Sequence, residues 1–332
     1  MKTRITYYDS LRGLAIIGVV FIHVLKYNDP KWKDVSIVFR QIINFSVPLF
    51  LALSGFFLAD KEISNKKEYL SFLRKQIPRV YYPYAVWSFA YIILNILILK
   101  KLNIEKQLFN FLIFQTIPIF YFVALIIQYY IFLPFFKKVM SKRLLLFAVT
   151  ISFLSCITIY GYQYFFNSQL PLILYAGNGL TWLMFFVLGM YLRNYKIPIH
   201  KNWMFFWTFV ALIFSILETY THIYFTVSVS NAVSAVKVSS FIYAALIIIL
   251  FLNYGTQKNL RFSDLGKVSY AIYLNHILIL MIVTKIFLFF KVSYTDFFTE
   301  VILGILTIII SYLLCTVLRK MNPKISAKFL GI

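Results

Sequence analysis

Three ionisable residues near the start of the chain, Asp9, Arg12 and His23, share one face of a predicted helix. Arg12 and His23 are eleven positions apart, which at about 100° per residue is about 20° more than three full turns. Asp9 precedes Arg12 by one turn on this face, and His23 lies roughly 16 Å further along the axis. Ionisable groups inside a membrane span cost at least ~2 kcal/mol each, so these residues are functional candidates.

The side chains of Arg12 and His23 suit two parts of one reaction. A neutral imidazole can take a proton from a sugar hydroxyl that attacks a thioester, or can itself be acylated first. A guanidinium is suited to phosphate. A long donor with an anionic head and a reactive tip would match their separation. The alternative is an interfacial ion pair of Arg12 with Asp9, with His23 as a hydrogen-bonded packing residue.

Two further polar pairs fall within apolar stretches. Glu218 and His222 are spaced i, i+4 near the outer end of a predicted helix, where a carboxylate could orient an imidazole. The alternative is an interfacial pair. Asn275 and His276 lie near mid-membrane in LGKVSYAIYLNHILIL, where a helix–helix hydrogen bond is the alternative. We expect both pairs to hold an acceptor or to support His23.

A pair of small residues and a basic loop complete the candidate site. Ser54 and Gly55 would let a ligand or another backbone approach closely, and plain helix packing is the favoured alternative. Arg74 and Arg79 belong to a basic cluster before Tyr81-Tyr82-Pro83. Anchoring at the cytoplasmic membrane surface explains most such clusters, and an anion site explains the others.

The composition requires a lipid environment for the elements that carry these residues. Of 332 residues 61% are hydrophobic and 13% are charged, with a mean hydropathy of +0.80. The net charge of +22 comes from loops between apolar stretches, so no nucleic-acid partner is expected. Cys156 and Cys315 lie in apolar runs without metal-ligand spacing, and no metal site is predicted.

The chain is predicted to be all-α, a single integral membrane domain over residues 1–332 that crosses the bilayer about ten times. No loop is long enough to hide a soluble domain. The weakest prediction is 108–136, because Pro118 splits the run and its first part could be interfacial or re-entrant. Predicted spans lie near 9–28, 37–59, 81–99, 117–136, 143–161, 171–192, 203–223, 237–253, 268–290 and 298–318.

Basic residues predict the orientation of this bundle. Lys and Arg near span ends remain cytoplasmic, and most of the 33 basic residues fall on one side if both termini are cytoplasmic. The basic N-terminal segment has no small-residue cleavage site, so we expect it to stay attached as the first helix. A multi-pass protein of the bacterial cytoplasmic membrane is expected. The predicted cytoplasmic segments are 1–8, 60–80, 137–143, 193–202, 254–267 and 319–332.

Four motifs together resemble the acyltransferase family 3 membrane O-acyltransferases. They are YYDSLRGLAIIGVVFIHV, PLFLALSGFFL, RKQIPRVYYPY and LGKVSYAIYLNH, in this order over nearly the whole chain. The resemblance implies that His23 is catalytic and that Arg12 serves the acyl-CoA donor. Arg74, Arg79 and Ser54 match family positions, and His276 matches a YLxH ending whose role is less clear. It implies acetyl-CoA as donor substrate and no permanently bound cofactor.

The sequence departs from the family pattern in two places, and the first departure affects the expected substrate. Some relatives carry an SGNH hydrolase-type domain after the membrane part, whereas this sequence ends at Ile332 without one. The resemblance is therefore to stand-alone O-acetyltransferases of capsular, exopolysaccharide or lipid-linked sugars. In the stretch FYFVALIIQYY, relatives often have a start of the Trp-Phe-Leu type. This difference leaves the placement within the family open.

Three hypotheses follow. The first is an O-acyltransferase that moves an acyl group, expected to be acetyl, from cytosolic acyl-CoA to a glycan hydroxyl. Its expected partners are membrane lipid and glycan-synthesis proteins. The second is a polysaccharide or lipid-linked-sugar exporter or flippase, with Arg12, Glu218, His222 and His276 along its path; the absence of visible repeats argues weakly against it. The third, a scaffold subunit of a glycan synthase, leaves the buried charges without a role.

Overall fold

The computed structural model describes residues 6–99, 103–166, 168, 170–226, 228–255, 261–293 and 296–332, and in these residues the regular structure is entirely helical. By length and composition, seven helical segments could cross a membrane, and two shorter apolar helices accompany them. The predicted polytopic helical bundle is confirmed. Residues 1–5 and 256–260, parts of two segments predicted to be cytoplasmic, lie outside the described residues.

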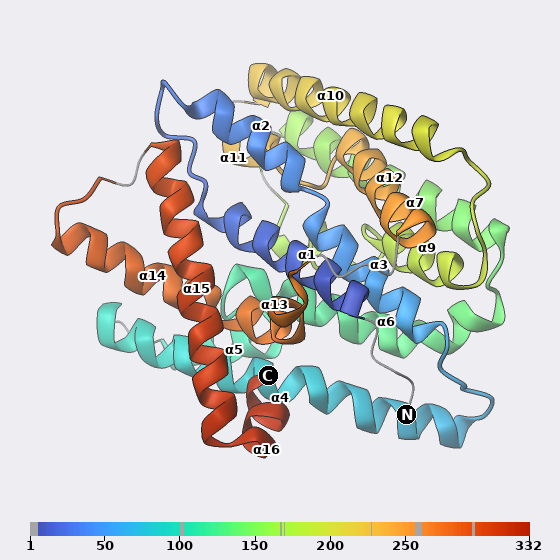
Figure 1. The fold of residues 1–332 in the computed structure, drawn as a ribbon, viewed down its shortest axis with the longest axis horizontal. Coiled ribbons are helices and arrows are strands. Elements are labelled where there is room, and N and C mark those ends of the chain that lie inside the picture. The colour runs from blue at the N-terminus through green and yellow to red at the C-terminus, as the bar shows by residue number, and fades with distance from the viewer. Residues whose placement is uncertain are drawn as a thin grey trace.

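The described helices follow one another in the order shown in Figure 1: α1 (Thr6–Val24), α2 (Lys33–Ile43), α3 (Ser46–Leu58), α4 (Lys66–Leu99), α5 (Ile104–Leu112), η1 (Pro118–Phe120), α6 (Tyr121–Lys138), α7 (Lys142–Phe166), α8 (Leu172–Tyr175), α9 (Leu183–Asn194), α10 (Lys201–Thr226), α11 (Val229–Ala232), α12 (Val238–Tyr254), α13 (Ser263–Lys267), α14 (Ser269–Phe289), α15 (Phe297–Met321), α16 (Pro323–Ile325) and η2 (Ser326–Leu330).

Each predicted span coincides with helical structure, but two spans are interrupted. The prediction of one helix over 171–192 is wrong, because α8 ends at Tyr175 and α9 begins only at Leu183. Gly177 and Gly179 lie in the gap, and glycine has low helix propensity. The span 37–59 contains a break between α2 and α3, and 81–99 is the second half of α4. A hydropathy window of about 20 residues does not reveal such breaks, because it averages over a few polar or small residues.

Helix α1 lies in the middle of the molecule and contacts α2, α3, α13, α14 and α15 (Figure 1). Two glycines bring α1 and α13 together. A Cβ atom on Gly266 would lie 1.7 Å from the backbone oxygen of Asp9, and one on Gly13 would lie 2.1 Å from the backbone oxygen of Phe262. Only glycine permits this approach, which fixes α13 beside the N-terminal half of α1.

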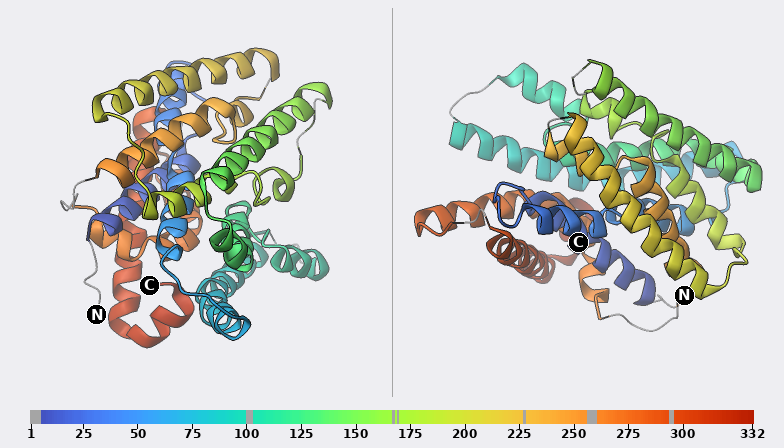
Figure 2. Two further views of the ribbon diagram at one scale, coloured as in Figure 1. Left: turned by 90° about the vertical axis from the view of Figure 1, so that its right-hand side faces the viewer. Right: turned by 90° about the horizontal axis from the view of Figure 1, so that it is seen from above.

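Helices α3 and α9 also pack through small residues. A Cβ atom on Gly55 would lie 2.0 Å from the backbone oxygen of Phe186, and one on Gly189 would lie 1.9 Å from that of Ala52. Gly55 therefore has the packing role that was the favoured alternative. Helix α10 lies at the periphery, along the upper edge of Figure 1 and of the left view of Figure 2, and packs on α12.

The predicted break at Pro118 is confirmed. The 3-10 turn η1 begins at Pro118 and leads into α6, because proline fits the first position of a helix. Before it lies the short helix α5, whose Ile104, Leu108, Phe109 and Leu112 side chains are exposed. Its interfacial or re-entrant position stays a prediction.

The buried apolar residues form two clusters. One is centred on α3, α6, α9 and α12, and the other on α1, α4, α14 and α15. Val47, Phe50, Val80 and Phe122 pack against both clusters. The candidate site lies where these two clusters meet.

Candidate active site

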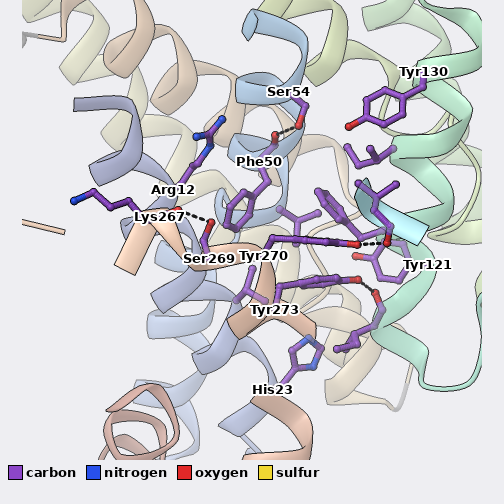
Figure 3. Close-up of a pocket in the computed structure, with 17 residues that line it drawn as sticks. Arg12, His23, Phe50, Ser54, Tyr121, Tyr130, Lys267, Ser269, Tyr270 and Tyr273 are labelled. Atoms are coloured by element: carbon purple, nitrogen blue, oxygen red, sulfur yellow. Dashed lines mark hydrogen bonds between the residues drawn. The ribbon is translucent and has the colours of Figure 1, made fainter. Parts of the chain in front are cut away.

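A cavity of about 270 Å³ lies between the two apolar clusters. Arg12 and Lys267 border it at one end and His23 at the other (Figure 3). Residues from α1, α3, α4, α6, α13 and α14 line it, so it depends on segments far apart in the sequence. The lining residues are Arg12, Val19, His23, Val47, Phe50, Ser54, Val80, Ile119, Tyr121, Phe122, Ile126, Tyr130, Gly266, Lys267, Ser269, Tyr270 and Tyr273.

His23 lies in the last turn of α1 and borders two cavities. The second cavity measures about 170 Å³ and shares His23, Val47, Ile119 and Tyr121 with the first. Arg12 and Lys267 line only the first cavity. The imidazole is therefore accessible from two different spaces, which is the arrangement required of a group that acts between a donor and an acceptor.

A second imidazole lies beside His23. The His276 ring centroid is 5.4 Å from that of His23. His276 is buried, and its Nδ1 lies 3.1 Å from the backbone oxygen of Ile272 and 2.8 Å from that of Tyr273. Carbonyl oxygens only accept hydrogen bonds, so Nδ1 carries a proton in this geometry. In the neutral ring Nε2 is then an acceptor, and it has no partner among the described residues.

The opposite end of the cavity is basic. The Arg12 Nη1 lies 3.1 Å from Asp9 Oδ1, and the Arg12 guanidinium lies 4.8 Å from the centre of the Phe57 ring. Asp9 itself is buried and does not line the cavity. Lys267 is exposed and pairs with Asp264 at 2.6 Å. The close packing of α13 on α1 brings this second cation to the mouth of the cavity.

The walls between the two ends are mainly aromatic. Tyr270 donates its hydroxyl to the backbone oxygen of Val80 at 2.6 Å, and Tyr273 donates to that of Ile119 (Figure 3). These bonds tie α14 to α4 and η1 and leave the ring faces to the cavity. Ser54 donates to the Phe50 backbone oxygen at 2.9 Å, so its small side chain is internally satisfied. The walls suit a thin, largely apolar ligand segment.

The sequence matches the model of the acyltransferase 3 family, described as an acyltransferase domain, over residues 5–316. The chain belongs to this family. It is a membrane acyltransferase, because its helical bundle and the family agree. No curated protein and no solved structure matches the chain. The matched range contains both cavities of this acyltransferase.

Arg74 and Arg79, which the sequence also assigned to acyl-CoA, are exposed on α4 and do not line the cavity. Val80 does line the cavity, and Arg79 directly precedes Val80 in the sequence. Their role in the acyltransferase stays a prediction, as do the roles of His23, Arg12, Asp9 and Ser54.

The structure places Glu218 and His222 away from His23. They line a separate groove between α7 and α10, in which the His222 ring stacks on Tyr160 with centroids 4.0 Å apart. The Glu218 carboxylate lies 3.6 Å from His222 Nε2 and accepts a hydrogen bond from the Ser239 backbone N–H at 3.0 Å. Ser239 is in the first turn of α12, so Glu218 stabilises that helix end. The geometry favours a structural role for this pair.

Asn275 lies next to His276 in the chain but contacts α15. Its Nδ2 donates to Cys315 Sγ at 3.4 Å, the helix–helix hydrogen bond that was the alternative. Asn275 Oδ1 has no partner among the described residues. Cys156 and Cys315 are buried, as expected of core residues.

Sequence reasoning missed four residues of the site. Lys267, Tyr270 and Tyr273 belong to a motif that was recognised, but their helix position alone does not show that they line a cavity with His23. Arg40 borders the second cavity. A signal for Arg40 was present, because it is a charged residue inside the predicted span 37–59.

Proposed function

We propose that the protein is an O-acyltransferase that moves an acetyl group from cytosolic acetyl-CoA to a hydroxyl of a cell-surface or lipid-linked glycan. The observation that carries this proposal is the single cavity that joins Arg12 and Lys267 to His23. A basic mouth suits the phosphates of CoA, and a narrow aromatic passage suits its pantetheine arm. The thioester would then reach His23.

Two chemical routes are open to His23, and the atoms and protons balance in each. In direct transfer, the acceptor oxygen attacks the thioester carbon and His23 takes the hydroxyl proton. The carbon–sulfur bond breaks, and the proton passes from His23 to the departing thiolate, which gives free CoA and the ester. In the two-step route the His23 nitrogen attacks first, the carbon–sulfur bond breaks, and the departing thiolate takes the imidazole proton; the acceptor hydroxyl then takes the acyl group and returns its proton to the imidazole.

His276 acts in this proposal as a positioning residue. Its protonated Nδ1 is held by two backbone oxygens, so its ring cannot turn freely. The unprotonated Nε2 supplies a fixed acceptor next to the His23 ring, 5.4 Å away by centroids. A fixed neighbouring dipole favours one orientation of His23, as second-shell partners do for other catalytic imidazoles.

The test is the O-acyl content of the surface glycan in cells that express the full-length protein. We expect His23→Ala to lower ester formation by roughly 100- to 10,000-fold, because the only imidazole at the junction of the two cavities is removed. The matched control is His200→Ala, which removes an exposed histidine from a loop. Normal acylation by an inserted His23→Ala protein would overturn the mechanism.

A further inference from the structure

Arg40 is a guanidinium inside the bundle that makes no ion pair with a carboxylate among the residues that the structure describes. It lies on α2, where its Nε donates to Asn44 Oδ1 at 2.9 Å and its Nη1 donates to the backbone oxygen of Ile22 at 2.7 Å. Within the described parts of the chain, no Asp or Glu oxygen lies within 4.0 Å of Arg40. Ile22 directly precedes His23, so Arg40 is held next to the reactive residue.

The orientation of Arg40 is fixed by a buried amide network. Asn44 Nδ2 donates to Gln41 Oε1 at 3.0 Å and to the backbone oxygen of Val233 at 3.1 Å. Gln41 Oε1 also accepts from the fully buried Lys237 ammonium at 2.9 Å. Asn44 therefore cannot move away from Arg40. A guanidinium has five N–H groups; these two bonds use two of them, the Tyr27 hydroxyl also lies beside the group, and N–H groups remain for a ligand.

Arg40 borders two cavities on the opposite side of His23 from Arg12. The first is the cavity of about 170 Å³ that begins at His23. The second, of about 130 Å³, is lined by the polar side chains of Gln163, Ser230, Asn231 and Ser234. The side-chain amides of Gln163 and Asn231 make no hydrogen bond to another described residue. These groups can bind sugar hydroxyls, so a glycan fits this space by its chemistry.

A charge at this position needs a reason beyond packing. Arg40 does satisfy the Ile22 carbonyl, one of the last carbonyls of α1, but an uncharged amide could do so without burying a charge. The nearby ammonium of Lys237 also has no carboxylate within 4.0 Å in the described structure. The Glu218 carboxylate acts on Lys237 from beyond that distance, so Arg40 is the cation that favours an anion at the two polar cavities.

We infer that Arg40 binds an oxyanion of the acceptor, a carboxylate or phosphate group close to the hydroxyl that receives the acyl group. This inference rests on the proposed function, because it gives the second cavity to the acceptor. The planar fork of Arg40 matches either oxyanion, and the anion fixes the sugar so that its hydroxyl faces His23. The acyltransferase therefore selects negatively charged glycans over neutral ones.

The test measures binding of three probes to the purified full-length protein in lipid nanodiscs by calorimetry. The probes are a glucuronate-containing disaccharide, its carboxyl-reduced neutral form, and a phosphorylated disaccharide. We expect a charged probe to bind at least about tenfold more tightly than the neutral one, and Arg40→Gln to remove this difference. A preference for the carboxylate probe identifies a uronate, and a preference for the phosphate probe identifies a sugar phosphate.

Two variants accompany Arg40→Gln. Arg319→Gln removes an exposed arginine at the end of α15 and should leave the preference intact. Arg40→Lys keeps the charge without the fork and should weaken charged-probe binding about tenfold. Unchanged binding of CoA shows that the Arg40 variants are folded. Loss of probe and CoA binding together would contradict the inference, because Arg40 would then support the whole bundle.

Equal binding of charged and neutral probes, or a charge preference that survives Arg40→Gln, would overturn the inference. The result is separable from the proposed function, because probe binding needs no turnover. If the protein shows Arg40-dependent anion binding but transfers no acyl group, the anion site remains and the acyltransferase assignment of the cavities fails. If the parent protein acylates charged and neutral sugars equally well, the assignment remains and the anion site fails.

Discussion

At the residue scale, the candidate site has an imidazole at one end and a guanidinium at the other. His23 borders two cavities, so it can meet two substrates. Arg12 is held by Asp9 and by the face of Phe57, and it lines only the first cavity. Asp9 therefore acts through Arg12 and does not contact the ligand space itself. The planar Arg12 guanidinium at this end of the cavity suits the phosphates of a ligand.

We predict that Arg12→Lys raises the KM for acyl-CoA about tenfold while kcat changes little. The ammonium keeps the charge but cannot reproduce the planar contact with phosphate or the stacking on Phe57. Steady-state kinetics with varied acetyl-CoA measure the effect. Arg193→Lys is the matched control, since Arg193 also pairs with an aspartate, Asp60, and lies over Phe56, outside the cavity. Equal KM values for Arg12→Lys and the parent would reduce Arg12 to an anchor.

At the scale of elements, glycine contacts decide where the functional helices lie. Gly13 and Gly266 let α13 lie against α1, and this contact carries Lys267 to the cavity. Hydrogen bonds from Tyr270 and Tyr273 then attach α14 to α4 and η1. The cavity is thus shaped by backbone approach as much as by the side chains that line it.

We predict that Gly266→Ala destabilises the protein by roughly 1–3 kcal/mol, because the new Cβ atom would meet the Asp9 backbone oxygen. Gly161→Ala is the control, since no atom lies within 4 Å of a Cβ there. That change should be neutral or stabilising by about 0.5–1 kcal/mol, as alanine favours a helix interior. Thermal unfolding in detergent measures both. A Gly266→Ala protein as stable as Gly161→Ala would show that α1 and α13 can separate at little cost.

At the scale of the whole molecule, the cavity exists because the two apolar clusters do not close on each other. Val47, Phe50, Val80 and Phe122 contact both clusters and border the space between them, together with Ser54. The predicted orientation, with both termini cytoplasmic, would open the Arg12 end to cytosolic acyl-CoA. The second cavity would then serve an acceptor from the other side.

We predict that Ser54→Phe blocks the passage between Arg12 and His23. The ring would fill space next to Phe50 and Tyr130, so acyl transfer should fall at least about tenfold while the protein still inserts. Ser155→Phe is the matched control. Ser155 also donates to the backbone oxygen four residues earlier, at 2.9 Å, but it borders neither cavity. Full activity of Ser54→Phe, measured by thiol release from acetyl-CoA, would show that the donor takes another route.

The sequence alone determined the membrane bundle, most of its helical segments, and the shared face of Arg12 and His23. These properties are local, because hydropathy and the 3.6-residue period act within one helix. Only the tertiary structure decided which side chains share a cavity. It brought His276, Lys267 and Tyr270 to the face of α1, placed Glu218 and His222 in another groove, and left Arg40 beside His23. Contacts between distant segments depend on how closely the backbones approach one another, and a single sequence carries no local pattern for that.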